Sequence, residues 1–79
     1  MKKLITKIDE VQWLREQSNK LEEVDEAKAD KLYAKAYELN QQVAQEIVKI
    51  VKGKLDIETV SMMIWQYSDK IKDILNRAA

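Results

Sequence analysis

An all-α fold is predicted from three features of the chain. Ala, Glu, Lys, Leu and Arg, which all favour helices, fill 36 of the 79 positions. Proline is absent and glycine occurs once, so the usual breaks between short elements are nearly missing. Apolar residues recur at three- and four-residue spacing, which is the period of an α-helix. We therefore expect one domain over residues 1–79, an up-down-up antiparallel three-helix bundle with helices at about 3–22, 26–52 and 56–78.

The first helix is predicted over residues 3–22. Its apolar positions share one helical face: Leu4, Ile8, Val11, Leu14 and Leu21. The acidic cluster at 22–26 suits the positive N-terminal end of a second helix, and a capping role would keep Asp25 off the apolar seam. One unbroken helix over 3–52 is the close alternative, because no Gly or Pro enforces a stop. As a hairpin with helix 56–78 it would need a dimer to cover its long arm.

The second helix, over residues 26–52, carries a wide apolar face. Two neighbouring stripes form this face: Ala29, Leu32, Ala36, Leu39 and Val43, and beside them Tyr33, Tyr37, Ala44, Ile47 and Val51. A face this wide suits an element packed between two others, so we expect the second helix to be central. Gly53 is the expected stop, because glycine readily adopts the left-handed conformation that ends many helices.

The third helix has the clearest start signal. Asp56 is a favourable N-cap, and Glu58 places a negative charge in the first turn. From there apolar residues recur at every three- or four-residue step: Ile57, Val60, Ile64, Tyr67, Ile71, Ile74 and Ala78. The pattern predicts one continuous helix to residue 78.

Composition limits the possible functions. The chain has no His and no Cys, so it lacks the commonest general base, the commonest metal ligand and the strongest nucleophile at neutral pH. We therefore expect no enzyme, no metal and no cofactor. The longest apolar run, residues 62–65, is far shorter than the roughly 20 residues needed to cross a bilayer. No signal-peptide pattern follows the opening lysines, so we expect a cytoplasmic protein without a membrane partner.

Three large apolar residues point away from the expected core. Trp13, Met62 and Trp65 each lie roughly 130–170° from the centre of the apolar stripe of their helix. Trp is enriched in interface hot spots, and Met lines adaptable binding surfaces. We therefore predict a partner-binding surface that contains these three residues with Gln66 and Asp69. The alternative is that each indole folds sideways and covers a flank of the core.

Asn40 is a polar residue near the middle of the wide apolar face. A buried amide needs hydrogen-bond partners, and such a residue can fix the register or oligomeric state of helices. The simpler alternatives are a less buried face, or a hydrogen bond to one of four polar residues: Tyr33, Tyr37, Tyr67 or Ser68.

These features predict a small non-catalytic protein of the adaptor or inhibitor type. It would bind another protein through the outward Trp/Met surface and self-associate. The alternative is a nucleic-acid-associated or nucleotide-sequestering protein, because residues 27–55 carry six Lys against three acidic residues. The net charge of zero and the outward acidic residues of the third helix argue against it. A carboxylate-based enzyme is the third hypothesis.

Overall fold

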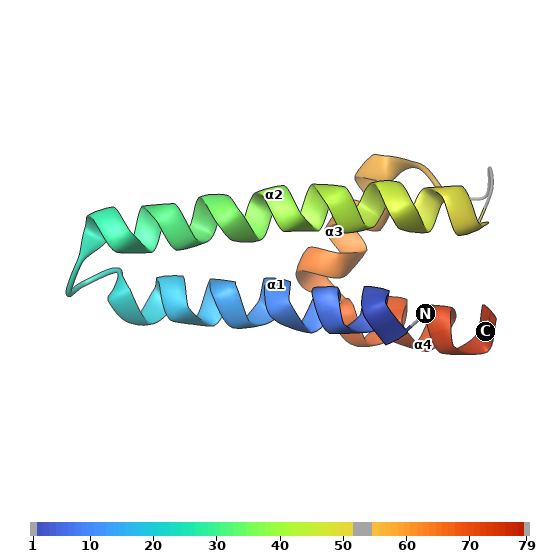
Figure 1. The fold of residues 1–79 in the computed structure, drawn as a ribbon, viewed down its shortest axis with the longest axis horizontal. Coiled ribbons are helices and arrows are strands. Elements are labelled where there is room, and N and C mark those ends of the chain that lie inside the picture. Colours follow the sequence, from blue (N-terminus) through green and yellow to red (C-terminus); the bar gives the residue numbers. More distant parts are fainter. Residues whose placement is uncertain (1, 52–54, 79) are drawn as a thin grey trace.

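Four helices form the described part of the chain. The computed structural model describes residues 2–51 and 55–78. Its helices are α1 (Lys2–Leu21), α2 (Glu26–Val51), α3 (Ile57–Gln66) and α4 (Ser68–Ala78). α1 and α2 lie antiparallel and side by side along the longest axis of the molecule, whereas α3 runs across that direction (Figure 1). The all-α prediction is confirmed, but the prediction of three helices is wrong.

The chain breaks between α1 and α2 where the acidic cluster predicts it. The N–H groups of Val24 and Asp25 both donate to the carbonyl of Leu21, at 3.0 and 2.7 Å, and close the turn. The Asp25 Oδ1 atom accepts a hydrogen bond from the N–H of Lys28 at 3.2 Å. Asp25 therefore caps α2, and the alternative of one helix over 3–52 is wrong. The predicted stop at Gly53 lies outside the described residues.

α3 begins at the predicted cap. The Asp56 backbone is extended (φ −91°, ψ 168°), and its side chain accepts a hydrogen bond from the N–H of Thr59 at 2.7 Å. This bond favours the ionised carboxylate and holds the pKa of Asp56 below its ordinary value. The N-terminal boundary of the predicted third helix is thus confirmed.

The predicted helix over 56–78 is interrupted at Tyr67, whose backbone leaves the helical region (φ −132°, ψ 49°). In a continuous helix the carbonyls of Ile64 and Trp65 would accept from N–H groups four residues later. Here Gln12 Nε2 donates to the Ile64 carbonyl at 2.8 Å, and the Arg15 guanidinium donates to the Trp65 carbonyl. Side chains of α1 therefore satisfy the carbonyl groups that the break exposes. Because these contacts come from a distant part of the sequence, no residue pattern near Tyr67 predicts the break.

The core lies where the helices meet. All four helices contribute fully buried side chains to one cluster: Ile8 and Val11 of α1, Val43, Ala44 and Ile47 of α2, Val60 and Ile64 of α3, and Ile71 and Leu75 of α4. Two members of the predicted third stripe are instead exposed, namely Ile57 in the first turn of α3 and Tyr67 at the break. Leu75, which the predicted stripe omits, is fully buried. The burial of Ala78 lies outside what the structure describes.

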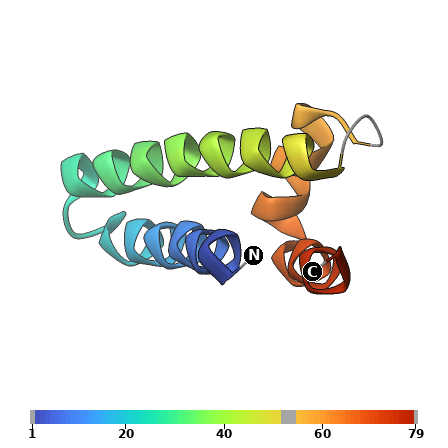
Figure 2. The same cartoon turned by 45° about the vertical axis from the view of Figure 1, so that its right-hand side comes forward.

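Among the described helices, α1 and α3 each contact all three others, so the prediction of a central second helix is corrected. α2 packs against α1 and α3 but not against α4. α3 crosses from the C-terminal end of α2 toward α1, and α4 then runs beside the N-terminal part of α1 (Figures 1 and 2). Because the chain turns away in this manner, the end of the hairpin near the α1–α2 turn contains two helices only (Figure 1).

Candidate partner-binding groove

A groove of about 440 Å³ lies between α2 and α3. Four of its lining residues come from α2: Tyr33, Tyr37, Asn40 and Gln41. Six come from α3: Ile57, Glu58, Ser61, Met62, Trp65 and Gln66. Of the eight large hydrophobic side chains that are exposed among the described residues, four line this groove. A concentration of apolar side chains at one surface depression is typical of an interaction site.

Aromatic side chains form one end of the groove. The rings of Tyr33 and Trp65 meet edge to face, with centroids 5.5 Å apart and planes at 78°. On α1, the guanidinium carbon of Arg15 lies 4.2 Å from the centroid of the Trp65 ring, in cation–π geometry. The indole is therefore held from two sides, whereas the rings of Tyr33 and Tyr37 are 53% and 55% exposed.

The outward orientation predicted for Trp65 is wrong. Its side chain is partly buried and packs against the core cluster, as in the alternative of an indole that covers a flank. The reason is that α3 crosses the hairpin instead of running alongside α2. A helix side that would face solvent in a straight bundle here faces Arg15 of α1 and Tyr33 of α2. Trp65 nevertheless lines the groove.

Asn40 connects the two helices that border the groove. Its side chain is 2% exposed, and its Nδ2 atom donates to the Oγ atom of Ser61 at 2.7 Å and to the Ser61 carbonyl at 3.2 Å. Gln41 Nε2 donates to the same Ser61 Oγ at 2.9 Å. The partner of Asn40 is therefore Ser61, which is none of the four residues predicted. Its Oδ1 atom is buried and has no hydrogen-bond partner among the described residues.

The structure brings together three of the predicted partner-binding residues. Met62, which is 49% exposed, lines the groove with Trp65 and Gln66. Trp13 is 55% exposed on α1, as predicted, but it does not line this groove. Asp69 also lies outside it, at the start of α4, with its Oδ1 atom 3.9 Å from the Lys72 Nζ atom. The predicted Trp/Met surface is thus divided between separate places on the molecule.

Several groove residues were missed in the sequence. Tyr33 and Tyr37 belong to the wide apolar face that the sequence predicts for α2, not to the predicted partner-binding surface. Their signal was present in the residue type, because tyrosine at a core edge keeps its hydroxyl in water and leaves part of its ring exposed. Glu58 was expected on the outward side of the third helix, whereas Ser61 gave no signal, since its role depends on where α3 crosses α2.

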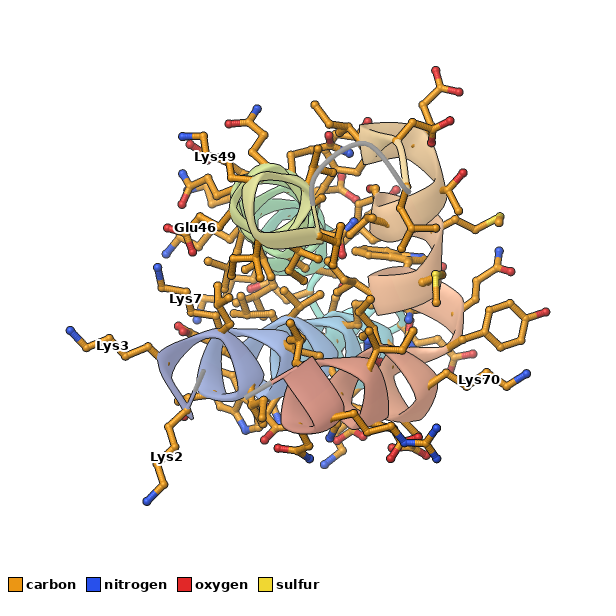
Figure 3. All side chains as sticks on the ribbon, turned by 90° about the vertical axis from the view of Figure 1, so that its right-hand side faces the viewer. Lys2, Lys3, Lys7, Glu46, Lys49 and Lys70 are labelled. Atoms are coloured by element: carbon orange, nitrogen blue, oxygen red, sulfur yellow. The ribbon has the colours of Figure 1, made fainter. Side chains whose placement is uncertain are left out.

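Lysines gather on other surfaces. Lys3, Lys7 and Lys49 lie on the side of α1 and α2 that faces away from α3 and α4 (Figure 3). There the Lys7 Nζ atom lies 3.6 Å from Glu46 Oε1. A second groove of about 380 Å³ between α1 and α2 has both charge signs in its lining: Glu10, Leu14, Lys35, Glu38, Leu39 and Gln42. The lysine-based hypothesis therefore concerns a surface separate from the groove between α2 and α3.

Within residues 2–51 and 55–78, no group of three or more His, Cys, Asp or Glu side chains could hold a metal ion. Over the same residues, no helix is both long enough and apolar enough to cross a bilayer. Comparison with protein-family models, with curated proteins and with solved structures gave no match.

Proposed function

We propose that this chain is a non-catalytic protein-binding module of the adaptor or inhibitor type, and that it binds its partner in the groove between α2 and α3. The main observation in support is that the half-exposed side chains of Tyr33, Tyr37 and Met62 lie together beside the indole of Trp65. Tyrosine and tryptophan supply much of the binding energy at protein interfaces, because they bury a large area and lose little side-chain entropy.

The framework of the groove also favours binding. Arg15 and Tyr33 hold the Trp65 ring, and the hydrogen bonds of Asn40 to Ser61 fix α3 against α2. A surface that is ordered before the partner arrives avoids part of the entropy cost of association. Glu58 and Gln66 at the same groove provide polar groups that would orient the partner.

We also predict that the chain self-associates. Trp13 offers an exposed indole on α1, separate from the groove. A second copy of the chain could use either surface, and the experiment below distinguishes a second copy from a different protein.

Site-specific photo-crosslinking tests the proposal. The photoreactive residue p-benzoylphenylalanine is introduced at position 62 in the groove, or at position 31 on an exposed part of α2 as the matched control. After irradiation in the cells that produce the chain, position 62 is expected to give one adduct of discrete mass, and position 31 none. An adduct of twice the chain mass would identify a second copy as the partner. Absence of an adduct at position 62, or the same adduct at both positions, would contradict the proposal.

A further inference from the structure

The side of α2 that borders the groove continues beyond it toward the α1–α2 turn. Glu26 and Asp30 precede Tyr33 and Tyr37 by seven residues each, so all four side chains lie on the same side of the helix. α3 ends at Gln66, near Tyr33, and beyond that point no third helix covers this side of α2 (Figure 1). The surface therefore extends from an aromatic groove into an uncovered helix face.

The charges on this surface have one sign. Among the described residues, Glu58 is the only charged one that lines the groove, and Glu26 and Asp30 lie on the side of α2 that extends from it. None of these three carboxylates lies within 4.0 Å of a basic group of the described residues. The lysines of the same part of α2 lie on its other side, roughly 100–160° away from Asp30: Lys28, Lys31 and Lys35.

Among the described residues, Arg15 is a cation beside this surface. Its guanidinium donates to the Trp65 carbonyl and to Gln12 Oε1, and it stacks on the Trp65 ring. These contacts hold it at the end of α3, and it forms no ion pair within 4.0 Å with any of the three carboxylates. Three carboxylates against one guanidinium leave these described residues with a net negative charge, which would attract a cationic partner.

We propose that the occupant of this groove is a basic amphipathic helix of a partner protein. The inference rests on the proposed function and names the chemistry of the partner. The apolar seam of such a helix would pack on Tyr33, Tyr37 and Met62, and its lysine or arginine side chains would reach the carboxylates of Glu58 and Asp30. A helix suits this surface because, among the described helices, α2 has only α1 beside it near the α1–α2 turn (Figure 1). A partner helix would pack there as a third helix, with its apolar face in the groove.

A second copy of the chain fits this groove less well. A symmetric dimer through the groove would bring Glu58 and Asp30 of both copies to one interface, and like charges at an interface cost several kcal/mol. The basic side of α2 in a second copy has the positive charge that the groove would attract, because Lys28, Lys31 and Lys35 are exposed there. It lacks the apolar seam that would pack on the aromatic residues of the groove.

Binding of designed peptides to the full chain tests the inference. The probe is a peptide of about 20 residues, long enough to form a helix, with Leu and Ala at helical spacing and Lys at the remaining positions. One control peptide has Glu in place of Lys, and another has the Lys peptide's composition in an order without an apolar seam. In a Trp13→Phe background, Trp65 is the only tryptophan and its fluorescence reports on the groove.

We expect the Lys peptide to bind at least about ten times more tightly than either control peptide. Asp30→Lys is expected to weaken its binding about tenfold. The matched control Glu38→Lys makes the same charge change on the same helix but in the second groove, and should alter binding less than about twofold. Positions 30 and 38 are exposed, so both substitutions are expected to leave the helices intact, and circular dichroism checks this.

Equal binding of the Lys and Glu peptides, or equal weakening by the two substitutions, would overturn the inference. Failure of the Lys peptide together with a specific crosslink at position 62 would show that the groove binds a partner of other chemistry, so the proposed function would stand. If the Lys peptide does not bind and position 62 gives no specific crosslink, both the inference and the proposed function are wrong. If light scattering finds a dimer of the chain that the Lys peptide does not dissociate, the occupant is a second copy and the inference is wrong.

Discussion

At the scale of single residues, buried polar contacts hold the helices of this small protein in place. Asn40 and Ser61 link α2 to α3, and Ser18 Oγ donates to the Ala29 carbonyl at 2.8 Å and links α1 to α2. A hydrogen bond of this kind contributes about 0.5–1.5 kcal/mol, which is a useful fraction of the stability of a small domain. Asn40 was recognised in the sequence as a polar residue on an apolar face, but its partner depends on the crossing of α3 and could not be identified there.

A double-mutant cycle measures the contact of Asn40 with Ser61. We expect Asn40→Ala and Ser61→Ala to show a coupling free energy of about 1 kcal/mol in urea unfolding, because each single change removes the same hydrogen bond. Asn40→Ala combined with Ser18→Ala is the control pair and should be additive, since the two residues share no partner. Additivity of Asn40→Ala with Ser61→Ala would show that the contact does not stabilise the fold.

At the scale of elements, the break between α3 and α4 decides the architecture. It turns α4 onto α1 and leaves the end of the hairpin without a third helix (Figure 2). Gln12 and Arg15 satisfy two of the carbonyls at this break, so they stabilise the bent form relative to a straight helix over 57–78.

Removal of these caps tests their role. Gln12→Ala and Arg15→Ala are each expected to lower the free energy of unfolding by about 1–2 kcal/mol, because each leaves a helix-end carbonyl without its partner. Chemical denaturation measures the change. Glu16→Ala, at an exposed position of α1, is the control and should change stability by less than about 0.5 kcal/mol. If Gln12→Ala and Arg15→Ala have the same free energy of unfolding as Glu16→Ala, these two side chains do not stabilise the bend between α3 and α4.

The sequence was informative about this fold where a local signal exists. The acidic cluster before Lys28 and the cap at Asp56 both mark real helix starts. No such signal marks Tyr67. The buried residues of α3 and α4 would lie within roughly 60° of one another on a straight helix as well, so periodicity cannot distinguish the two forms: Val60, Ile64, Ile71 and Leu75.

At the scale of the whole molecule, the position of α3 creates the candidate site. It packs four helices around a core at one end and leaves an aromatic groove between α2 and α3. The end of the hairpin near the α1–α2 turn has no third described helix beside it (Figure 1). The net charge of zero hides a separation among the described residues, because Glu26, Asp30 and Glu58 lie on the groove side of α2 and α3, whereas Lys28, Lys31 and Lys35 lie on the other side of α2. Met62, Trp65 and Gln66, which line this groove, belong to the surface predicted from the sequence. The contribution of Tyr33 and Tyr37 required the crossing of α3 over α2.

The location of a bound helix on the molecule is the most direct test of the account. Amide chemical shifts of the isotopically labelled chain are recorded during titration with the Lys peptide. The largest changes are expected in residues 33–41 and 57–66, which border the groove, with small changes around Trp13. Changes centred on Trp13 or on the lysines near residue 49, with the groove residues unaffected, would contradict the account.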